Sequence, residues 1–179
     1  LVHISNFRKV KRVEDVLTMF CSLRKIVPAK LLLVGDGPER IKMEELARKI
    51  CAYEDVRFLG KLEQVEEVLS VSDLFVMPSE KESFGLAALE AMACEVPVIS
   101  SNAGGLPELV QNGISGYLCN VGDVDDMVKK AIHILDENNL AKFKQGALAR
   151  AKEFDIQAIL PMYEAVYARV QRNVLKVVS

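Results

Sequence analysis

Short apolar runs alternate along the chain with longer segments in which apolar residues recur every three or four positions. The short runs predict strands at residues 1–4, 30–34, 56–59, 74–77, 96–99 and 116–119. The periodic segments predict helices at residues 13–27, 39–53, 65–71, 84–93 and 106–111, followed by a helical tail at 124–135, 140–152 and 156–170. Strands separated by helices pair in parallel through right-handed crossovers. We therefore expect a single α/β domain over residues 1–179, a doubly wound, Rossmann-like parallel sheet of about six strands.

Ligands of doubly wound sheets bind at the carboxyl ends of the strands. The candidate loops are therefore those that follow residues 4, 34, 59, 77 and 99.

The bulk composition narrows the class of protein. Half of the residues are hydrophobic and 27% are charged, which is typical of a soluble globular domain. The net charge of -2 gives no indication of binding to nucleic acid or to an anionic membrane. No apolar run approaches the ~18 residues of a membrane span.

Cysteine and histidine usage predicts neither disulfides nor a metal site. The four cysteines are widely spaced in apolar segments, which favours buried free thiols in a reducing cytoplasm. They are Cys21, Cys51, Cys94 and Cys119. The two histidines, His3 and His133, are far apart and have no partner at ligand spacing.

The most informative segment is residues 80–93, which follows a predicted strand and opens a predicted helix. Ser83 is the expected N-cap, which leaves the amides of Phe84, Gly85 and Leu86 without intrahelical partners. Free amides at the positive end of the helix dipole form an anion site.

Two glutamates accompany this predicted helix start. Glu90 follows the cap by about two turns, roughly 10 Å along the same face, and Glu82 precedes it. The alternative is a capped helix whose glutamates face water. Because Glu90 lies in a run that is apolar nearly all round, its carboxylate is expected to need a partner, which favours a ligand.

A second cluster, residues 5–12, holds four cations between the first strand and the first helix. Cations at a helix N-terminus oppose its dipole, so they suit a site whose ligand is an anion such as pyrophosphate. Taken alone, the stretch is equally well explained as a solvated basic loop.

Two glycine-containing turns are less specific. Residues 102–108 either place backbone amides near a substrate or merely turn the chain. Residues 35–40 begin like a dinucleotide fingerprint, but Arg40 occupies the third glycine position, which argues against nicotinamide binding.

Together these segments resemble the retaining glycosyltransferases of family four, which have the two-domain GT-B architecture. Residues 82–90 are similar to the E-x7-E motif of that family in its E-S-F-G form. Further matching segments fall in the expected order at 34–38, 58–60, 97–99, 104–108 and 112–118. The resemblance covers nearly the whole chain as the C-terminal, donor-binding domain, and it implies that the N-terminal acceptor domain is absent from this chain.

Residues 3–12 and 80–83 look most like the branch of the family that acts in bacillithiol biosynthesis. That branch transfers N-acetylglucosamine from UDP-N-acetylglucosamine to L-malate. The resemblance thus implies a UDP-sugar donor and a small acceptor.

The resemblance also implies roles for individual residues. Glu82 would be the catalytic residue and would hold a hydroxyl of the transferred sugar. Glu90 would bind the ribose, Lys11 the diphosphate, and the backbone of Gly60 and Lys61 the uracil. The implied donor-binding set is Ser5, Arg8, Lys11, Gly60, Lys61, Ser83, Phe84, Gly85, Leu86 and Glu90. Many relatives carry an arginine where this chain has Asn6, and Arg8 is expected to supply that charge.

The implied reaction retains the anomeric configuration, with the leaving UDP stabilised by cations and helix amides. No Asp-x-Asp pair follows a strand, so we expect neither a metal nor another cofactor. The chain alone is expected to be inactive, cytoplasmic, and prone to self-associate through residues 156–170.

Two alternatives remain. A non-catalytic, nucleotide-binding regulatory domain would use the same fold, although the pair of Glu82 and Glu90 favours the transferase. A sugar-nucleotide epimerase has a similar two-domain fold, but no set of residues here suggests its base.

Overall fold

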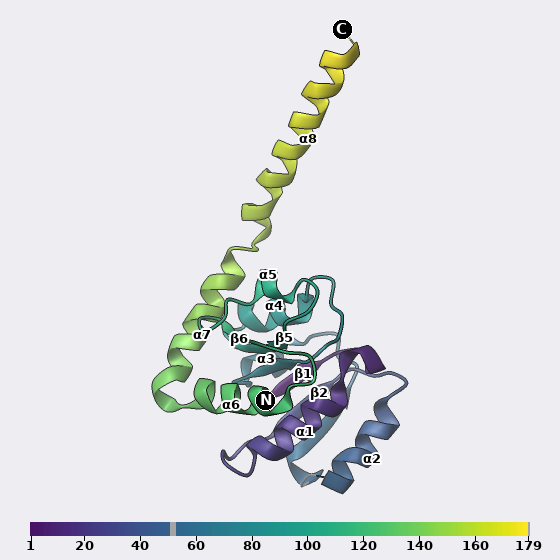
Figure 1. Cartoon of the computed structure of the whole chain (residues 1–179), viewed down its shortest axis with the longest axis vertical. Helices are drawn as coiled ribbons and strands as arrows, with labels where there is room; N and C mark the ends of the chain where they lie inside the picture. Colours follow the sequence, from purple (N-terminus) through teal and green to yellow (C-terminus); the bar gives the residue numbers. More distant parts are fainter. Residues whose placement is uncertain (51–52, 179) are drawn as a thin grey trace.

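The computed structural model describes residues 1–50 and 53–178, with residues 172–178 described through their backbone alone. Six parallel strands form one sheet in the order β3-β2-β1-β4-β5-β6. The strands are β1 (Val2–Ile4), β2 (Leu31–Val34), β3 (Val56–Gly60), β4 (Phe75–Met77), β5 (Val98–Ser101) and β6 (Gly116–Cys119). The predicted doubly wound parallel sheet is confirmed, and the strand order reverses between β1 and β4 at its centre (Figure 1).

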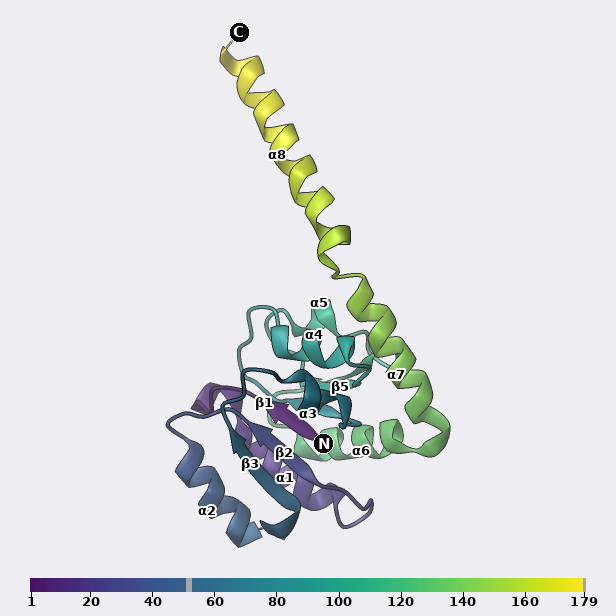
Figure 2. The ribbon, with the colours of Figure 1, turned by 180° about the vertical axis from the view of Figure 1, so that it is seen from behind.

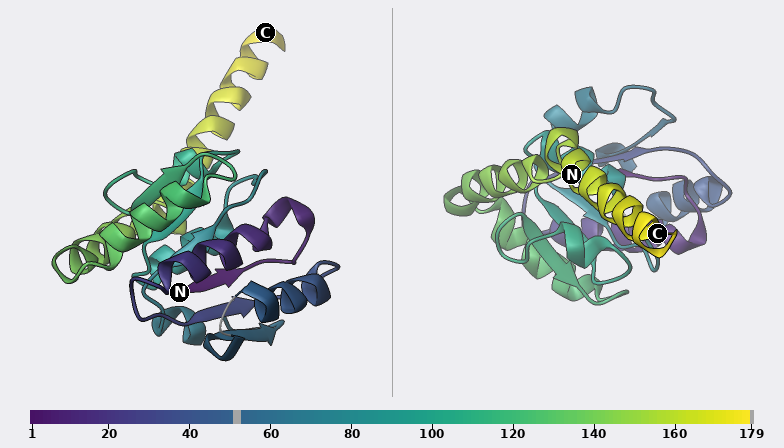
Figure 3. Two further views of the ribbon diagram at one scale, coloured as in Figure 1. Left: turned by 60° about the horizontal axis from the view of Figure 1, so that its bottom comes forward. Right: turned by 90° about the horizontal axis from the view of Figure 1, so that it is seen from above.

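Helices cover both faces of this sheet. The helices are α1 (Val13–Leu23), α2 (Arg40–Ile50), α3 (Glu66–Ser70), α4 (Leu86–Ala93), α5 (Leu106–Leu109), α6 (Val124–Leu135), α7 (Glu137–Lys152) and α8 (Ile156–Val178), with two 3-10 turns, η1 (Lys9–Lys11) and η2 (Tyr53–Asp55). One face packs against α1, α2 and α6, and the other against α3, α4 and α5 (Figures 2 and 3). Buried apolar side chains therefore form two core layers, one on each side of the strands.

The last helix leaves the body of the domain. α8 extends away from the sheet as a single long rod, beyond the predicted end at residue 170 (Figure 1). None of the described helices is both long and apolar enough to cross a membrane.

Several predicted boundaries shift for local reasons. α6 has the predicted bounds, whereas α1 ends at Leu23 rather than at residue 27. α4 begins at Leu86, two residues later than predicted, because the preceding Gly85 has a φ of 96° and cannot continue a right-handed helix backwards.

The cysteines differ in part from the prediction. Cys94 and Cys119 are free, and burial, as the largest cause, raises the pKa of both thiols. Cys21 is disulfide-bonded, so the prediction of a free thiol was wrong for that residue. Cys51 lies outside the described residues.

Small residues set the distance between α7 and α4. Ala88 and Ala91 of α4 and Ala147 and Ala151 of α7 are all buried in the same core layer. Interiors of this density have no free volume for a larger side chain.

We expect Ala147→Leu to destabilise the domain by about 1–3 kcal/mol, since the added carbons overpack the contact between α7 and α4. Chemical denaturation measures this loss. Ala149→Leu, on the exposed side of the same helix, is the matched control. Equal stability of the two variants would contradict this account of the packing.

Candidate functional site

Two loops meet where the strand order reverses. One follows β1 and contains the predicted basic cluster, and the other follows β4 and contains Glu82. The amide of Glu80 donates to the carbonyl of Val10 over 2.9 Å, which joins the two loops through their backbones. The structure thus brings together two sequence clusters that lie about 70 residues apart, at the place where doubly wound sheets bind ligands.

The central contact of these loops is an ion pair between two predicted site residues. The ammonium of Lys11 lies 2.5 Å from Oε2 of Glu82, and the side chains are only 19% and 14% exposed. An ammonium has three donors, so Lys11 can bind Glu82 and still donate to a neighbouring anion.

A second cation of the basic cluster is also neutralised within the chain. Arg12 binds Asp15 and Glu80. Both cations thus face carboxylates of the same chain, so they are not simply solvated, and whether a ligand anion also binds them stays a prediction.

The start of α4 differs from the prediction. Gly85, not Ser83, is the N-cap, and the first helical bonds run from the amides of Ala88 and Leu89 to the Gly85 carbonyl. Ser83 is exposed and does not cap α4. The amides that precede the first helical bond are those of Leu86 and Ala87, so the anion-binding end of this helix lies one to two residues further along than predicted.

A glycine pair supports the loop that carries Glu82. The amide of Gly105 donates to the carbonyl of Glu82 over 2.9 Å. A Cβ at Gly104, whose φ is +60°, would lie 1.9 Å from the same carbonyl oxygen. These glycines therefore allow the loop at residues 102–105 to touch the backbone of the loop that carries Glu82.

A second glycine turn supports the loop after β1 in the same way. A Cβ at Gly35 would lie 1.7 Å from the carbonyl oxygen of Ser5, and one at Gly37 would lie 2.1 Å from that of Asn6. The turn that resembled a dinucleotide fingerprint therefore packs against the backbone of the basic cluster.

A buried histidine lies beneath Ser5. His3 is fully buried, with Nδ1 at 2.8 Å from the carbonyl of Val76 and Nε2 at 2.8 Å from Oγ of Ser5. Burial is the largest cause that lowers the pKa of His3 to about 4. The hydrogen bond to Val76 opposes this shift, and the charge of Lys11 adds to it. A neutral ring whose Nδ1 faces a carbonyl must carry its proton on Nδ1.

Glu90 is more exposed than expected. The buried face of α4 consists of Ala88, Ala91 and Met92, and Glu90 lies on the exposed side. Partial burial and the neighbouring carboxylate of Glu66 raise the pKa of Glu90. The expectation that Glu90 is buried and needs a partner was therefore wrong. Its surroundings nevertheless disfavour the ionised form of its side chain.

Comparison with known proteins shows the family. Residues 1–150 match the family described as Glycosyl transferases group 1. The chain belongs to the group 1 glycosyltransferases.

Individual relatives within this family differ in what they make. The chain is 47% identical over 176 residues to the N-acetyl-alpha-D-glucosaminyl L-malate synthase of Bacillus anthracis, covering 97% of this chain and 46% of the relative. It is 33% identical to a sulfoquinovosyl transferase of Arabidopsis thaliana, covering 88% of this chain and 31% of the relative. The chain thus spans half or less of the length of these relatives.

Solved structures agree with the fold. The Anabaena protein HepE, solved in complex with UDP, is 25% identical and superposes with a TM-score of 0.82 over 93% of this chain and 48% of its own. The pneumococcal O-GlcNAc transferase GtfA superposes with a TM-score of 0.86 over 95% of this chain and 35% of its own, and its 20% identity supports the fold alone. The GT-B character predicted from the sequence is confirmed.

Within this glycosyltransferase domain, Gly60 and Lys61 lie at the same edge of the sheet as the two loops. Gly60 ends β3 with a φ of +74°, and its carbonyl accepts from the amide of Gly35 over 2.7 Å. Nη1 of Arg40 lies 3.5 Å from where a Cβ at Gly60 would stand, and Glu44 fixes that guanidinium at 2.9 Å. The sequence pattern placed Arg40 only at the third position of a dinucleotide fingerprint, where a glycine is expected. The spacing of four residues between Arg40 and Glu44 also indicates an ion pair that fixes this side chain.

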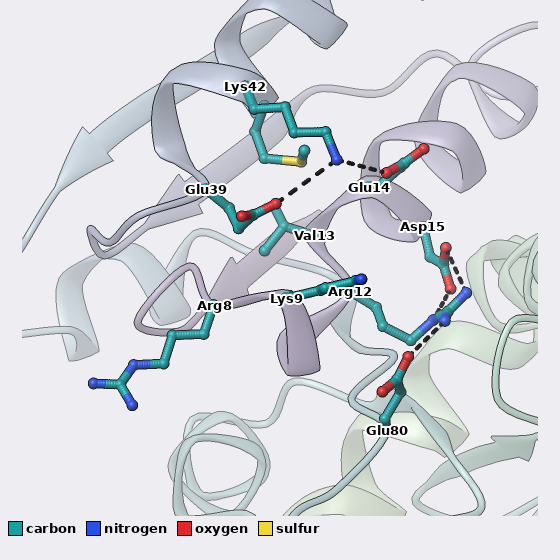
Figure 4. A pocket seen from close by; sticks show the side chains of 10 residues that line it. Arg8, Lys9, Arg12, Val13, Glu14, Asp15, Glu39, Lys42 and Glu80 are labelled. Carbon is teal, nitrogen blue, oxygen red and sulfur yellow. Dashed lines mark hydrogen bonds and ion pairs between the residues drawn. The ribbon is translucent and has the colours of Figure 1, made fainter.

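A cavity beside this edge is lined by one predicted site residue, Arg8. It measures about 240 Å³ and lies between the start of α1, the start of α2 and Glu80 (Figure 4). Figure 4 shows the side chain of Arg8 extending away from the ion pairs of this cavity. The other predicted donor-binding residues line no part of this cavity.

The buried His3 predicts a specific loss of stability in acid. The unfolded chain protonates this histidine below about pH 6.5, whereas the folded chain does so only below about pH 4. Stability contributed by neutral His3 is therefore complete above pH 6.5 and falls as the pH decreases, by about 3 kcal/mol at pH 4.

Urea denaturation between pH 4 and 7 tests this, with His3→Asn as the variant that keeps a donor for Val76 but does not titrate. We expect the stability of His3→Asn to depend less steeply on pH than that of the wild type. His133→Asn, which removes the exposed histidine, is the control and should keep the steep dependence. Identical pH dependence in the wild type and His3→Asn would refute the assignment.

Proposed function

We propose that this chain is the donor-binding part of a retaining glycosyltransferase that moves a sugar from a nucleotide sugar to a small acceptor. The donor we propose is UDP-N-acetylglucosamine and the acceptor L-malate. The observation that carries this proposal is the 47% identity to the N-acetyl-alpha-D-glucosaminyl L-malate synthase of Bacillus anthracis across 97% of the chain. The complex of HepE with UDP supports the choice of nucleotide.

The loops at the centre of the sheet suggest how the donor would be held. Lys11, already opposite Glu82, would donate its remaining hydrogens to the diphosphate. The amides of Leu86 and Ala87 at the start of α4 would face the same phosphates. Preorganised donors of this kind stabilise the negative charge that develops on leaving UDP.

Glu82 and Glu90 would bind the hydroxyls of the donor. Glu82 would hold a hydroxyl of the transferred sugar, and Lys11 keeps its carboxylate next to the diphosphate site. Glu90 would accept hydrogen bonds from the ribose, for which its exposed position on α4 leaves room. The backbone of Gly60 and Lys61 would meet the uracil, with Ser5, Arg8, Ser83, Phe84 and Gly85 completing the site.

We propose that the reaction needs no metal. The Lys11 ammonium and the helix amides would carry the charge that a metal ion carries in other transferases. Among the described side chains, those of residues 1–50 and 53–171, no three His, Cys, Asp or Glu side chains lie together in a group that could hold a metal ion.

The acceptor and the rest of the active site would come from a second domain. The chain spans 46% of the length of the Bacillus anthracis synthase, which leaves room in that relative for another domain of similar size. We therefore propose that this chain is inactive alone. We also propose that its place of action is the cytoplasm and that nucleic acid is not a partner.

Calorimetric titration tests the donor site. We expect the chain to bind UDP and UDP-N-acetylglucosamine more tightly than GDP, and Glu90→Ala to weaken UDP binding about tenfold, because a charged hydrogen bond to the ribose is lost. Glu45→Ala, an exposed helical glutamate on α2, is the control and should bind like the wild type.

The same titration in EDTA tests the absence of a metal. Unchanged affinity is expected, and a loss that Mg²⁺ restores would count against the proposal. If the folded wild type bound no uridine nucleotide, the donor-site proposal would fail and the regulatory alternative with another ligand would take its place.

The exposed face of α8 leads us to propose that this chain self-associates. Five apolar side chains recur at spacings of four and three residues and are 49–69% exposed. They are Ile156, Leu160, Tyr163, Tyr167 and Val170. This heptad spacing is typical of a helix that packs along another helix.

Sedimentation velocity should show a concentration-dependent dimer for the wild type and a monomer for Tyr163→Lys combined with Tyr167→Lys, because two charges would be buried in the contact. Ala165→Lys, on another side of α8, should still dimerise. A wild type that stays monomeric at all concentrations would rule the contact out.

A further inference from the structure

Arg12 has a backbone conformation that its side chain does not favour. It lies between η1 and α1 with φ 50° and ψ 45°, in the left-handed region. That conformation is strained for a residue with a Cβ. Such conformations persist where the surrounding structure imposes them, and they concentrate at functional sites.

The guanidinium of Arg12 connects three segments. Nε and Nη2 donate to the two oxygens of Asp15 over 2.6 and 3.1 Å, and Nη1 donates to Oε1 of Glu80 over 2.9 Å. These hydrogen bonds raise the pKa of Arg12, with the bond to Asp15 the largest cause. A Cβ at Gly122 would lie 3.1 Å from Nη2, so that glycine leaves the guanidinium its space.

The contacts of three consecutive residues interleave with those of the opposite loop. The carbonyl of Val10 accepts from the amide of Glu80, Lys11 pairs with Glu82, and Arg12 pairs with Glu80. We refer to the bonds from Arg12 to Asp15 and Glu80 as the Arg12 bridge. Figure 4 shows Arg12 between Asp15 and Glu80. The bridge joins the same two loops as the Lys11–Glu82 pair.

A diphosphate that accepts the remaining hydrogens of Lys11 would share the ammonium with Glu82. The ion pair that joins the loops would then weaken when the site has to hold its ligand. The Arg12 bridge involves neither Lys11 nor Glu82, so it would keep its strength. It would then hold the loops at the spacing that lets Lys11 reach the phosphates.

We propose that Arg12 is a positioning residue for the diphosphate, acting through Glu80 to keep Lys11 within reach of the ligand. This role rests on the proposed function, because it requires that a nucleoside diphosphate binds at these loops. Arg12 itself touches no part of the donor.

Glu80→Gln is the variant that tests the bridge with least disturbance, because it removes only the charge opposite Arg12 and its side chain is 46% exposed. We expect UDP affinity to fall about tenfold in calorimetric titration, the loss typical of a weakened charge-assisted contact. Uridine affinity, followed by NMR titration, should not change, because uridine lacks the diphosphate. Glu14→Gln, a neighbouring acid that faces Lys42 rather than Arg12, should bind UDP like the wild type.

A double-mutant cycle shows whether the effect passes through Lys11. Glu80→Gln should cause no further loss of UDP affinity in a Lys11→Ala background. Three outcomes would overturn the positioning role alone, provided that the wild type binds UDP. They are the same loss of UDP affinity from Glu80→Gln in both backgrounds, a parallel loss of uridine affinity, and no loss of UDP affinity at all. A folded wild type that binds no UDP would overturn the proposed function and this role with it.

Discussion

The backbones of two glycine turns approach the loops after β1 and β4 so closely that no Cβ fits between them. Gly35 touches the carbonyl of Ser5, and Gly104 touches that of Glu82. Such contacts fix backbone against backbone without relying on side-chain rotamers. Because each loop is held from its outer side in this way, their inner sides face one another at the reversal of strand order, where Lys11 meets Glu82.

Electrostatics then determine what the joined loops can bind. Partly exposed ion pairs contribute about 1 kcal/mol or less each to stability, so the pairs of Lys11 and Arg12 matter more for orientation than for folding. Each cation already has a carboxylate partner, so a phosphate bound by Lys11 would share an ammonium that Glu82 already orients. A site of this kind remains ordered before its ligand arrives.

The fold was predictable because hydrophobic periodicity and strand–helix alternation determine it. The six parallel strands and the bounds of α6 follow from that pattern, and the family follows from the order of its motifs. The details of the site were not predictable, since they depend on conformations that residue type disfavours or leaves open. A serine directly before an apolar helical run predicts an N-cap, yet the positive φ of Gly85 moves the helix start past Ser83. The left-handed Arg12 and the exposed side of α4 likewise depend on tertiary contacts that no local pattern records.

The tautomer of His3 gives the hydroxyl of Ser5 a direction. With its proton on Nδ1, the ring can only accept a hydrogen bond at Nε2. The Ser5 hydroxyl therefore donates its single hydrogen to the histidine. Oγ of Ser5 then has only lone pairs left for other partners. The amide nitrogen of Phe7 donates to this oxygen over 3.4 Å. A ligand hydroxyl or an ammonium can donate to this oxygen, whereas a phosphate oxygen meets repulsion there. In the proposed donor site, a residue that ordinarily binds either kind of group would thereby be made selective by the buried ring beneath it.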